Sequence, residues 1–275
     1  MKRAFSLALL FVLAACSSSS SPSTPASGTP AASSGTPSDN GEGATDEGDG
    51  PFKTYVILGD SISDGGGTGP YFYELLGEDL KAKLGGIEVV KNSKSGARSN
   101  GLPNQVETLP AELAGPVAVS VTIGGNDMQL AALDILNGTD EAARSAFTDN
   151  LVKAYDELTR EGRFGAGVKV KIFHATIYDP TDGEGNFAEA GCPGYLAALP
   201  KQPTRTYWDN WNKAAADVLA KYGDSVVTVD IRAKFEGHGV GKLKDGTSWF
   251  APDCIHPNTT GHDEIHKLFL AAIAP

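Results

Sequence analysis

The stretch from Thr54 to Ser61 constrains the fold of this chain more than any other. An apolar run, Tyr55 to Leu58, ends abruptly at Gly59, Asp60 and Ser61. A short run of this kind is typical of a strand that is buried on both faces of an α/β sheet. Such sheets bind ligands just beyond the carboxyl ends of their strands, where Ser61 is expected to lie. A serine hydroxyl needs a base to remove its proton, so a catalytic Ser61 requires a histidine, an orienting acid and oxyanion donors elsewhere in the chain.

Strand-like and helix-like segments alternate after this point. Apolar runs predict further strands at residues 87–90, 117–123, 168–177 and 226–231. Apolar residues at helical spacing predict helices at residues 71–84, 102–113, 140–160, 204–221 and 259–273. Five strands separated by helices indicate an α/β fold, with three α/β/α layers around a five-stranded parallel sheet. Residues 51–275 suffice for one such domain but hardly for two.

The first residues have the pattern of a bacterial export signal. Lys2 and Arg3 precede an apolar stretch that is too short to span a membrane. The segment Leu13-Ala14-Ala15-Cys16 resembles a lipobox, which implies cleavage before Cys16 and acylation of that residue. We therefore expect an exported protein anchored by lipid to the bacterial cell envelope. Ser17 favours the outer membrane where there are two membranes; ordinary secretion, with Cys16 incidental, is the alternative.

Residues 17–50 consist of small, polar and acidic residues and proline, with no apolar side chain larger than alanine except that of proline. Such a segment cannot form a core, and it is predicted to be a disordered tether with a reach on the order of 30 Å. The expected organisation is a signal at 1–15, a lipidated tether at 16–50 and one folded domain at 51–275. The net charge of −11 argues against nucleic acid as a partner, because phosphate binding relies on Lys and Arg.

Four short motifs fall at the ends of the predicted elements. They are Gly59-Asp60-Ser61 after the first strand, Asn92-Ser93-Lys94-Ser95-Gly96 after the second, Gly124-Gly125-Asn126-Asp127 after the third, and Asp253-Cys254-Ile255-His256 before the last helix. Each alone is a weak signal, but together and in this order they resemble the SGNH hydrolases, also called the GDSL esterase and lipase family, across residues 52–273. The resemblance implies a flavodoxin-like sheet. The rival α/β-hydrolase motif Gly-x-Ser-x-Gly is absent from the sequence.

The resemblance implies a role for each matching residue. Ser61 would be the nucleophile, His256 its base, and Asp253 the acid that orients His256. The backbone N–H groups of Ser61 and Gly96 and the side-chain amide of Asn126 would bind the oxyanion. No cofactor and no metal are expected. Taken one at a time, Gly96 reads as a turn glycine, and Asn126 and Asp253 as turn or helix-capping residues.

Three other features have competing interpretations. His262 and His266 are spaced like zinc ligands, but ordinary polar positions on a helix are the favoured interpretation. The glycines at 65–69 lack the pattern of a phosphate-binding loop and are expected to give mobility at the rim of the site. Trp249 and Phe250 either form a stacking platform for a substrate or simply pack in the core.

Cys192 and Cys254 are the only thiols left if Cys16 is lipidated. A disulfide between them would tie the long loop from Tyr178 to Pro203 to the residue beside Asp253, and two buried free thiols are the alternative. The same loop is rich in Gly and Pro and is expected to shape the substrate pocket.

The sequence thus predicts a monomeric, metal-independent serine esterase that acts on carboxylic esters through an acyl-serine intermediate. The acyl and alcohol parts stay open among short-acyl, carbohydrate and lipid esters. Two alternatives are a non-catalytic lipoprotein that binds a carbohydrate or lipid, and an acyltransferase on the same fold.

Overall fold

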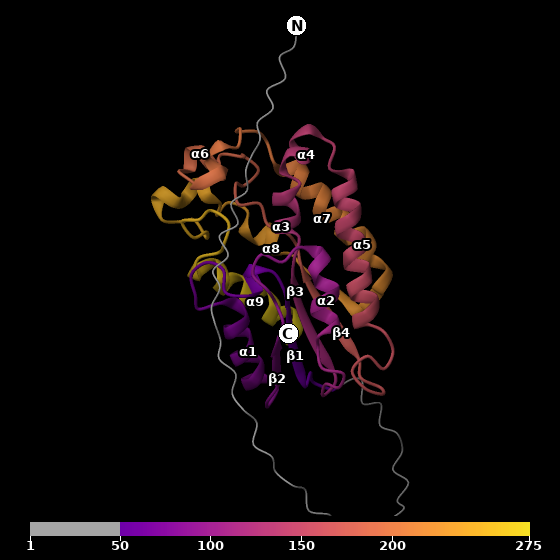
Figure 1. Cartoon of the computed structure of the whole chain (residues 1–275). Coiled ribbons are helices and arrows are strands. Elements are labelled where there is room, and N and C mark those ends of the chain that lie inside the picture. Colours follow the sequence, from indigo (N-terminus) through magenta and orange to yellow (C-terminus); the bar gives the residue numbers. More distant parts are fainter. Residues whose placement is uncertain (1–49) are drawn as a thin grey trace, which may run out of the picture. The chain divides into compact units, whose positions relative to one another are not determined.

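The computed structural model describes residues 50–275; the predicted signal, Cys16 and nearly all of the tether lie outside the described residues. Five strands form one sheet: β1 (Thr54–Gly59), β2 (Glu88–Lys91), β3 (Val117–Thr122), β4 (Val170–Ala175) and β5 (Val226–Val229). Neighbouring strands all pair in parallel, in the order β2-β1-β3-β4-β5. This confirms the predicted five-stranded parallel sheet of an α/β fold (Figure 1).

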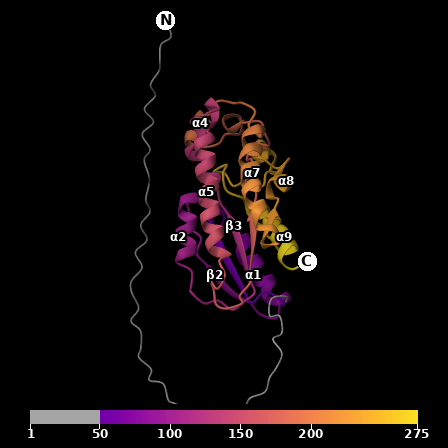
Figure 2. The same ribbon diagram turned by 90° about the vertical axis from the view of Figure 1, so that its right-hand side faces the viewer.

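Helices cover both faces of the sheet (Figures 1 and 2). The helices are α1 (Phe72–Lys83), α2 (Leu102–Glu107), α3 (Gly125–Leu130), α4 (Ala132–Asn137), α5 (Glu141–Leu158), α6 (Phe187–Ala190), α7 (Arg205–Leu219), α8 (Ile231–Phe235) and α9 (Thr259–Ile273). Helices α2, α5 and α7 pack on one face, and α1, α8 and α9 on the other. None of the helices in the described part of the chain is long and apolar enough to cross a membrane.

Strand β1 shows why the sequence forms this core. Its residues are all buried, and successive side chains enter opposite layers. Val56 and Leu58 pack with the α2, α5 and α7 layer, whereas Tyr55 and Ile57 pack with the α1 and α9 layer. A strand with both faces covered needs a continuous apolar run, which is the pattern that the sequence has.

The predicted elements agree with the structure except at short segments. The helix expected at 102–113 ends at Glu107, since Thr108 caps it and Pro110 follows. Helices α3, α4, α6 and α8 are missing from the prediction. Helix α3 begins within Gly124-Gly125-Asn126-Asp127, which reads locally as a turn, and six residues are too few to show a helical period.

The strand order places the functional site. Chain connections run in opposite directions from β1 and β3, so the topological switch point lies between these two strands. Ser61 follows β1 and Asn126 follows β3. Both residues therefore lie at the crevice where doubly wound sheets bind their ligands.

Candidate active site

Ser61 opens a short 3-10 turn, Ser61–Ser63, directly after β1. Asp60 caps this turn: its Oδ1 accepts hydrogen bonds from the backbone N–H of Ile62 at 3.1 Å and from Thr122 Oγ1 at 3.0 Å. Burial raises the pKa of the Asp60 carboxyl to about 7, although both hydrogen bonds lower it. The turn is thus bonded to the end of β3, which holds the Ser61 hydroxyl at the carboxyl edge of the sheet.

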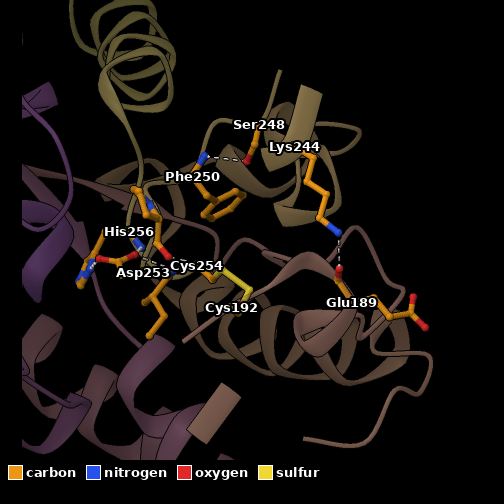
Figure 3. The surroundings of a disulfide bond; sticks show 10 residues. Glu189, Cys192, Lys244, Ser248, Phe250, Asp253, Cys254 and His256 are labelled. Carbon is orange, nitrogen blue, oxygen red and sulfur yellow. Dashed lines mark hydrogen bonds and ion pairs between the residues drawn. A yellow bond between two sulfur atoms is a disulfide. The ribbon is translucent and has the colours of Figure 1, made fainter. Parts of the chain in front are cut away.

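The three residues expected to form the triad lie in one hydrogen-bonded row. The Ser61 hydroxyl is 2.8 Å from His256 Nε2, and His256 Nδ1 is 2.7 Å from Asp253 Oδ2. A carboxylate only accepts, so Nδ1 carries the proton and Nε2 is free to accept from Ser61. Figure 3 shows Asp253 beside the His256 ring, on the loop that precedes α9. The arrangement has the geometry that nucleophile activation requires.

Asp253 is held as a carboxylate. Partial burial raises the pKa of this group, but hydrogen bonds from the His256 ring and from the backbone N–H groups of His256 and Ile255 outweigh it and lower the pKa to about 2. Both backbone bonds reach Oδ1 at 2.9 Å. The carboxylate therefore stays charged near neutral pH, and its Oδ2 orients the imidazole.

The predicted oxyanion donors come from three separate segments. In the described residues, neither the backbone N–H of Ser61 nor that of Gly96 has a hydrogen-bond partner within the protein. Asn126 donates one amide hydrogen to the Ala97 carbonyl at 2.9 Å, which brings it next to the Gly96 segment. An amide group has two hydrogens, so one stays free to donate to a substrate oxygen.

Asp64 joins the Ser61 turn to the Gly96 segment. Its Oδ2 accepts a hydrogen bond from the backbone N–H of Ser95 at 2.7 Å, and its Oδ1 forms an ion pair with Lys91. Asp64 therefore bonds the backbone of the residue directly before Gly96.

Within the glycine segment 65–69, Gly66 and Gly67 lie against His256. The mobility expected of this rim stays a prediction. A Cβ added to Gly66 would lie 2.4 Å from His256 Cδ2 and 3.0 Å from Ser61 Cβ. The Gly66 N–H donates to the Ser61 carbonyl at 2.7 Å, and its own carbonyl accepts from His262 Nε2 at 2.9 Å. Glycine is required here because the backbone touches the catalytic ring.

A cavity of about 170 Å³ opens at Ser61. Its walls come from the ends of β3 and β4, from α3 and α4, from the start of α7 and from the loop after β4. The lining is mainly apolar and includes Met128, Ile135, Ile177, Leu196 and Trp208. Ser61 and Asn126 are among the few polar residues on its surface. This is the composition of a site that holds an apolar group beside a small number of polar ones.

A family model matches the chain over residues 57–264, that of the GDSL-like Lipase/Acylhydrolase family. The chain belongs to this GDSL-like family. The matched residues run from β1 into α9 and include all four motifs described above. A comparison of the sequence with curated proteins found no significant match.

Solved structures of esterases and lipases resemble this fold. The acetylxylan esterase Axe2 from Geobacillus stearothermophilus has 20% identity and a TM-score of 0.53, covering 82% of this chain and 96% of its own. An extracellular lipase from Streptomyces rimosus has 20% identity and a TM-score of 0.53, covering 80% and 99%. A lipase from a goat rumen metagenome has 18% identity and a TM-score of 0.53, covering 80% and 97%. Because it belongs to the GDSL-like Lipase/Acylhydrolase family, the chain described here is a serine ester hydrolase.

Several residues of this GDSL-like chain have roles that the sequence left open. Cys192 and Cys254 form a disulfide. Phe250 is buried in the core, and Trp249 packs between Phe235 and His238. Neither residue lines the cavity, so the interpretation of the pair as a stacking platform is wrong. His262 and His266 have separate partners, Gly66 and Asp79, instead of a shared ligand.

Two residues near the triad make contacts that were not expected. Tyr178 donates its hydroxyl hydrogen to the Ile255 carbonyl at 2.8 Å, between Asp253 and His256. His262 donates a hydrogen bond from Nε2 to the Gly66 carbonyl at 2.9 Å. Neither had a signal in the sequence, because each acts through a backbone group that lies far away along the chain.

Proposed function

We propose that Ser61, His256 and Asp253 hydrolyse carboxylic esters through an acyl-serine intermediate. The observation that carries this proposal is the single row of hydrogen bonds from Asp253 through His256 to the Ser61 hydroxyl. The row supplies a nucleophile, a base with the correct tautomer and an acid that stabilises the imidazolium.

The first half of the reaction forms the acyl-enzyme. Ser61 Oγ attacks the ester carbonyl while its proton passes to His256 Nε2, and Asp253 Oδ2 stabilises the charged ring. The imidazolium then gives this proton to the departing alkoxide as the ester C–O bond breaks. In the second half, His256 takes a proton from water, the hydroxide attacks the acyl carbonyl, and the proton returns to Ser61 Oγ.

The negative charge on the carbonyl oxygen needs donors that are already in position. We assign these donors to the backbone N–H groups of Ser61 and Gly96 and to the free hydrogen of the Asn126 amide. Each donor of this kind is worth about 100- to 1,000-fold in rate.

The apolar cavity supports esters with an acyl chain longer than acetyl as the substrates. A water- or methyl-sized group needs about 10–15 Å³ of such space, so the cavity accommodates on the order of ten of them. Burying each methylene contributes about 0.8 kcal/mol to binding. A medium-length acyl chain therefore gains several kcal/mol in this cavity, which an acetyl group does not.

The place of action follows from the N-terminal sequence. We propose export and lipid attachment at Cys16, with the tether holding the hydrolase near the cell envelope. Cells fed a labelled fatty acid are expected to label the full chain and not the Cys16→Ser variant. Label on the variant would place the lipid elsewhere or rule out this anchor.

The catalytic proposal is tested with nitrophenyl esters of increasing acyl length and a fluorophosphonate probe. Ser61→Ala is expected to lower kcat by roughly four to six orders of magnitude and to abolish labelling. Ser145→Ala, an exposed serine on α5, is the matched control. A fluorophosphonate that labels Ser61→Ala as well as the parent enzyme would refute the assignment of the nucleophile. A rate that is highest for the acetyl ester would refute the proposal that the substrates carry an acyl chain longer than acetyl.

A further inference from the structure

The loop from residue 178 to 203, called here the tethered loop, forms one wall of the cavity. It contains α6 and the 3-10 turn Gly194–Ala198. Phe187, Tyr195, Leu196 and Leu199 of this loop line the cavity, facing α3 and α4 on the opposite side. An apolar chain in the cavity must therefore contact the tethered loop along part of its length.

The disulfide fixes the middle of the tethered loop. Cys192 and Cys254 are both buried, and the bond crosses 62 positions of sequence to reach the residue next to Asp253 (Figure 3). A second bond on the same segment runs from Lys244 Nζ to the Glu189 carbonyl at 3.2 Å, from a partly exposed side chain. The disulfide is thus the one covalent support of this wall, only a few residues from Tyr195 and Leu196.

Tyr195 joins the tethered loop to the opposite wall. Its hydroxyl donates to Gln129 Oε1 at 3.0 Å, and Gln129 lies on α3. Both side chains line the cavity, and Tyr195 is 45% exposed, so this bond spans the opening at the protein surface. The wall is consequently held from two sides: by Cys254 in the interior and by Gln129 at the surface.

The triad does not depend on the disulfide for its geometry. The loop that carries it is closed by hydrogen bonds from Ala251 N–H to the His256 carbonyl at 2.8 Å and from Tyr178 to the Ile255 carbonyl. Asp253 adds its own bonds to Ile255 and His256. Between residues 186 and 200, the hydrogen bonds from the described part of the tethered loop to the rest of the chain are those of Glu189 with Lys244 and of Tyr195 with Gln129. Loss of the disulfide therefore frees this part of the cavity wall before it disturbs the catalytic row.

We infer that the tethered loop sets the acyl-chain preference of this esterase, with the Cys192–Cys254 disulfide and the Tyr195–Gln129 bond holding its wall against the chain of a medium-length acyl ester. This inference rests on the proposed function of Ser61 and extends it to substrate selection. Against a fixed apolar wall, each added methylene of the acyl chain contributes binding free energy. A loosened wall lets water in, and this contribution is lost.

The test measures kcat/KM for acetyl and octanoyl nitrophenyl esters with protein produced from the full chain. Cys192→Ala/Cys254→Ala is expected to lower the octanoyl-to-acetyl ratio about tenfold, a typical effect of weakening an apolar pocket by one or two methylenes. Tyr195→Phe, which keeps the ring and removes the bond to Gln129, is expected to lower the ratio by a smaller factor. Tyr222→Phe, whose hydroxyl bonds Asp156 far from the cavity, is the matched control and leaves the ratio unchanged.

The outcomes separate this inference from the catalytic proposal. The inference alone is overturned if the parent enzyme has normal Ser61-dependent turnover and both variants keep its octanoyl-to-acetyl ratio. Equal loss for both esters also overturns it, since the disulfide would then act on the triad. If the double cysteine variant does not fold, the octanoyl-to-acetyl ratio of Tyr195→Ala, a change on the exposed rim, decides the inference in its place. Absence of Ser61-dependent turnover in the parent enzyme would instead overturn the proposed function.

Discussion

At the scale of single residues, Gly66 is a position where the site has no room for a side chain. Its backbone contacts both His256 and Ser61, and its two hydrogen bonds link Ser61 to His262. The side chain of any other residue would occupy the space of the imidazole.

Gly66→Ala is expected to lower kcat about 100-fold. Its Cβ would lie 2.4 Å from His256 Cδ2, so the ring must move by about 1 Å, and a displacement of this size costs about two orders of magnitude in rate. Gly101→Ala, which has open space around it, is the control and keeps the parent rate. Ester hydrolysis at saturating substrate measures the effect; a parent-like kcat in Gly66→Ala would mean that the ring is not held by this contact.

His262 makes the stability of the protein depend on pH. Burial lowers the pKa of this imidazole from 6.5 to about 4, and its Nδ1 has no partner among the described residues. In the unfolded chain, the His262 imidazole therefore binds a proton as the pH falls through about 6.5. In the folded protein it does so only near pH 4. The stabilisation is complete above pH 6.5 and is lost as the pH falls toward 4, by about 3 kcal/mol at most.

His262→Gln removes this titration while its amide still donates to the Gly66 carbonyl. The difference in unfolding free energy between parent and variant is therefore expected to change between pH 6.5 and 4 and to be constant above pH 7. Urea denaturation across this range measures it. Parallel pH curves for the two proteins would show that His262 is not the titrating group; Asp60, whose raised pKa favours the folded state at low pH, acts equally in both.

At the scale of elements, the ends of β1, β2 and β3 contribute to the site through their connections to one another. Asp64, after the Ser61 turn, accepts the Ser95 N–H of the segment that follows β2. Asn126, at the start of α3, donates to Ala97 of the same segment. The position of the Gly96 N–H therefore depends on two elements that are distant from it in sequence.

Asp64→Ala is expected to lower kcat about tenfold and to leave KM nearly unchanged, because the Gly96 donor acts on the transition state more than on the bound ester. Asp64→Asn retains an oxygen for the Ser95 N–H and recovers part of the loss. Lys91→Met removes the ion pair alone and has the smaller effect. A rise in KM at constant kcat would assign Asp64 to substrate binding, against this prediction.

At the scale of the whole molecule, the disulfide connects the cavity wall to the loop before α9, across 62 residues. Closing a loop of this length in the unfolded chain stabilises the folded state by up to about 4 kcal/mol. Cys192→Ala/Cys254→Ala is expected to lose most of this, measured as a lower urea midpoint with a steeper slope, because the unfolded chain without the cross-link exposes more surface. An unchanged midpoint would mean that the unfolded chain is already restricted in this region.

Much of the architecture was predictable because local pattern and tertiary demand coincide. The continuous apolar runs of β1 and β3 and the helical period of α5, α7 and α9 identify long elements that are buried by one face or both. Helices α3 and α4 were missed because six residues carry too little periodicity, and α3 also begins on a glycine pair. The expected site residues were assigned from the family resemblance. Their hydrogen-bonded geometry agrees with the expected roles, and these roles stay predictions until tested.

By itself, the sequence determined the parallel α/β sheet, the position of Ser61 after its first strand, and the four motifs that point to ester hydrolysis. These features are local, since each depends on a few consecutive residues and on the period of the chain. Only the tertiary structure decided the partners of His262, Tyr178 and Asp64, the packing of Gly66 against His256, the pairing of the cysteines and the apolar cavity. Each of these joins segments far apart in sequence, and the physical contact that defines it exists only after the chain has folded.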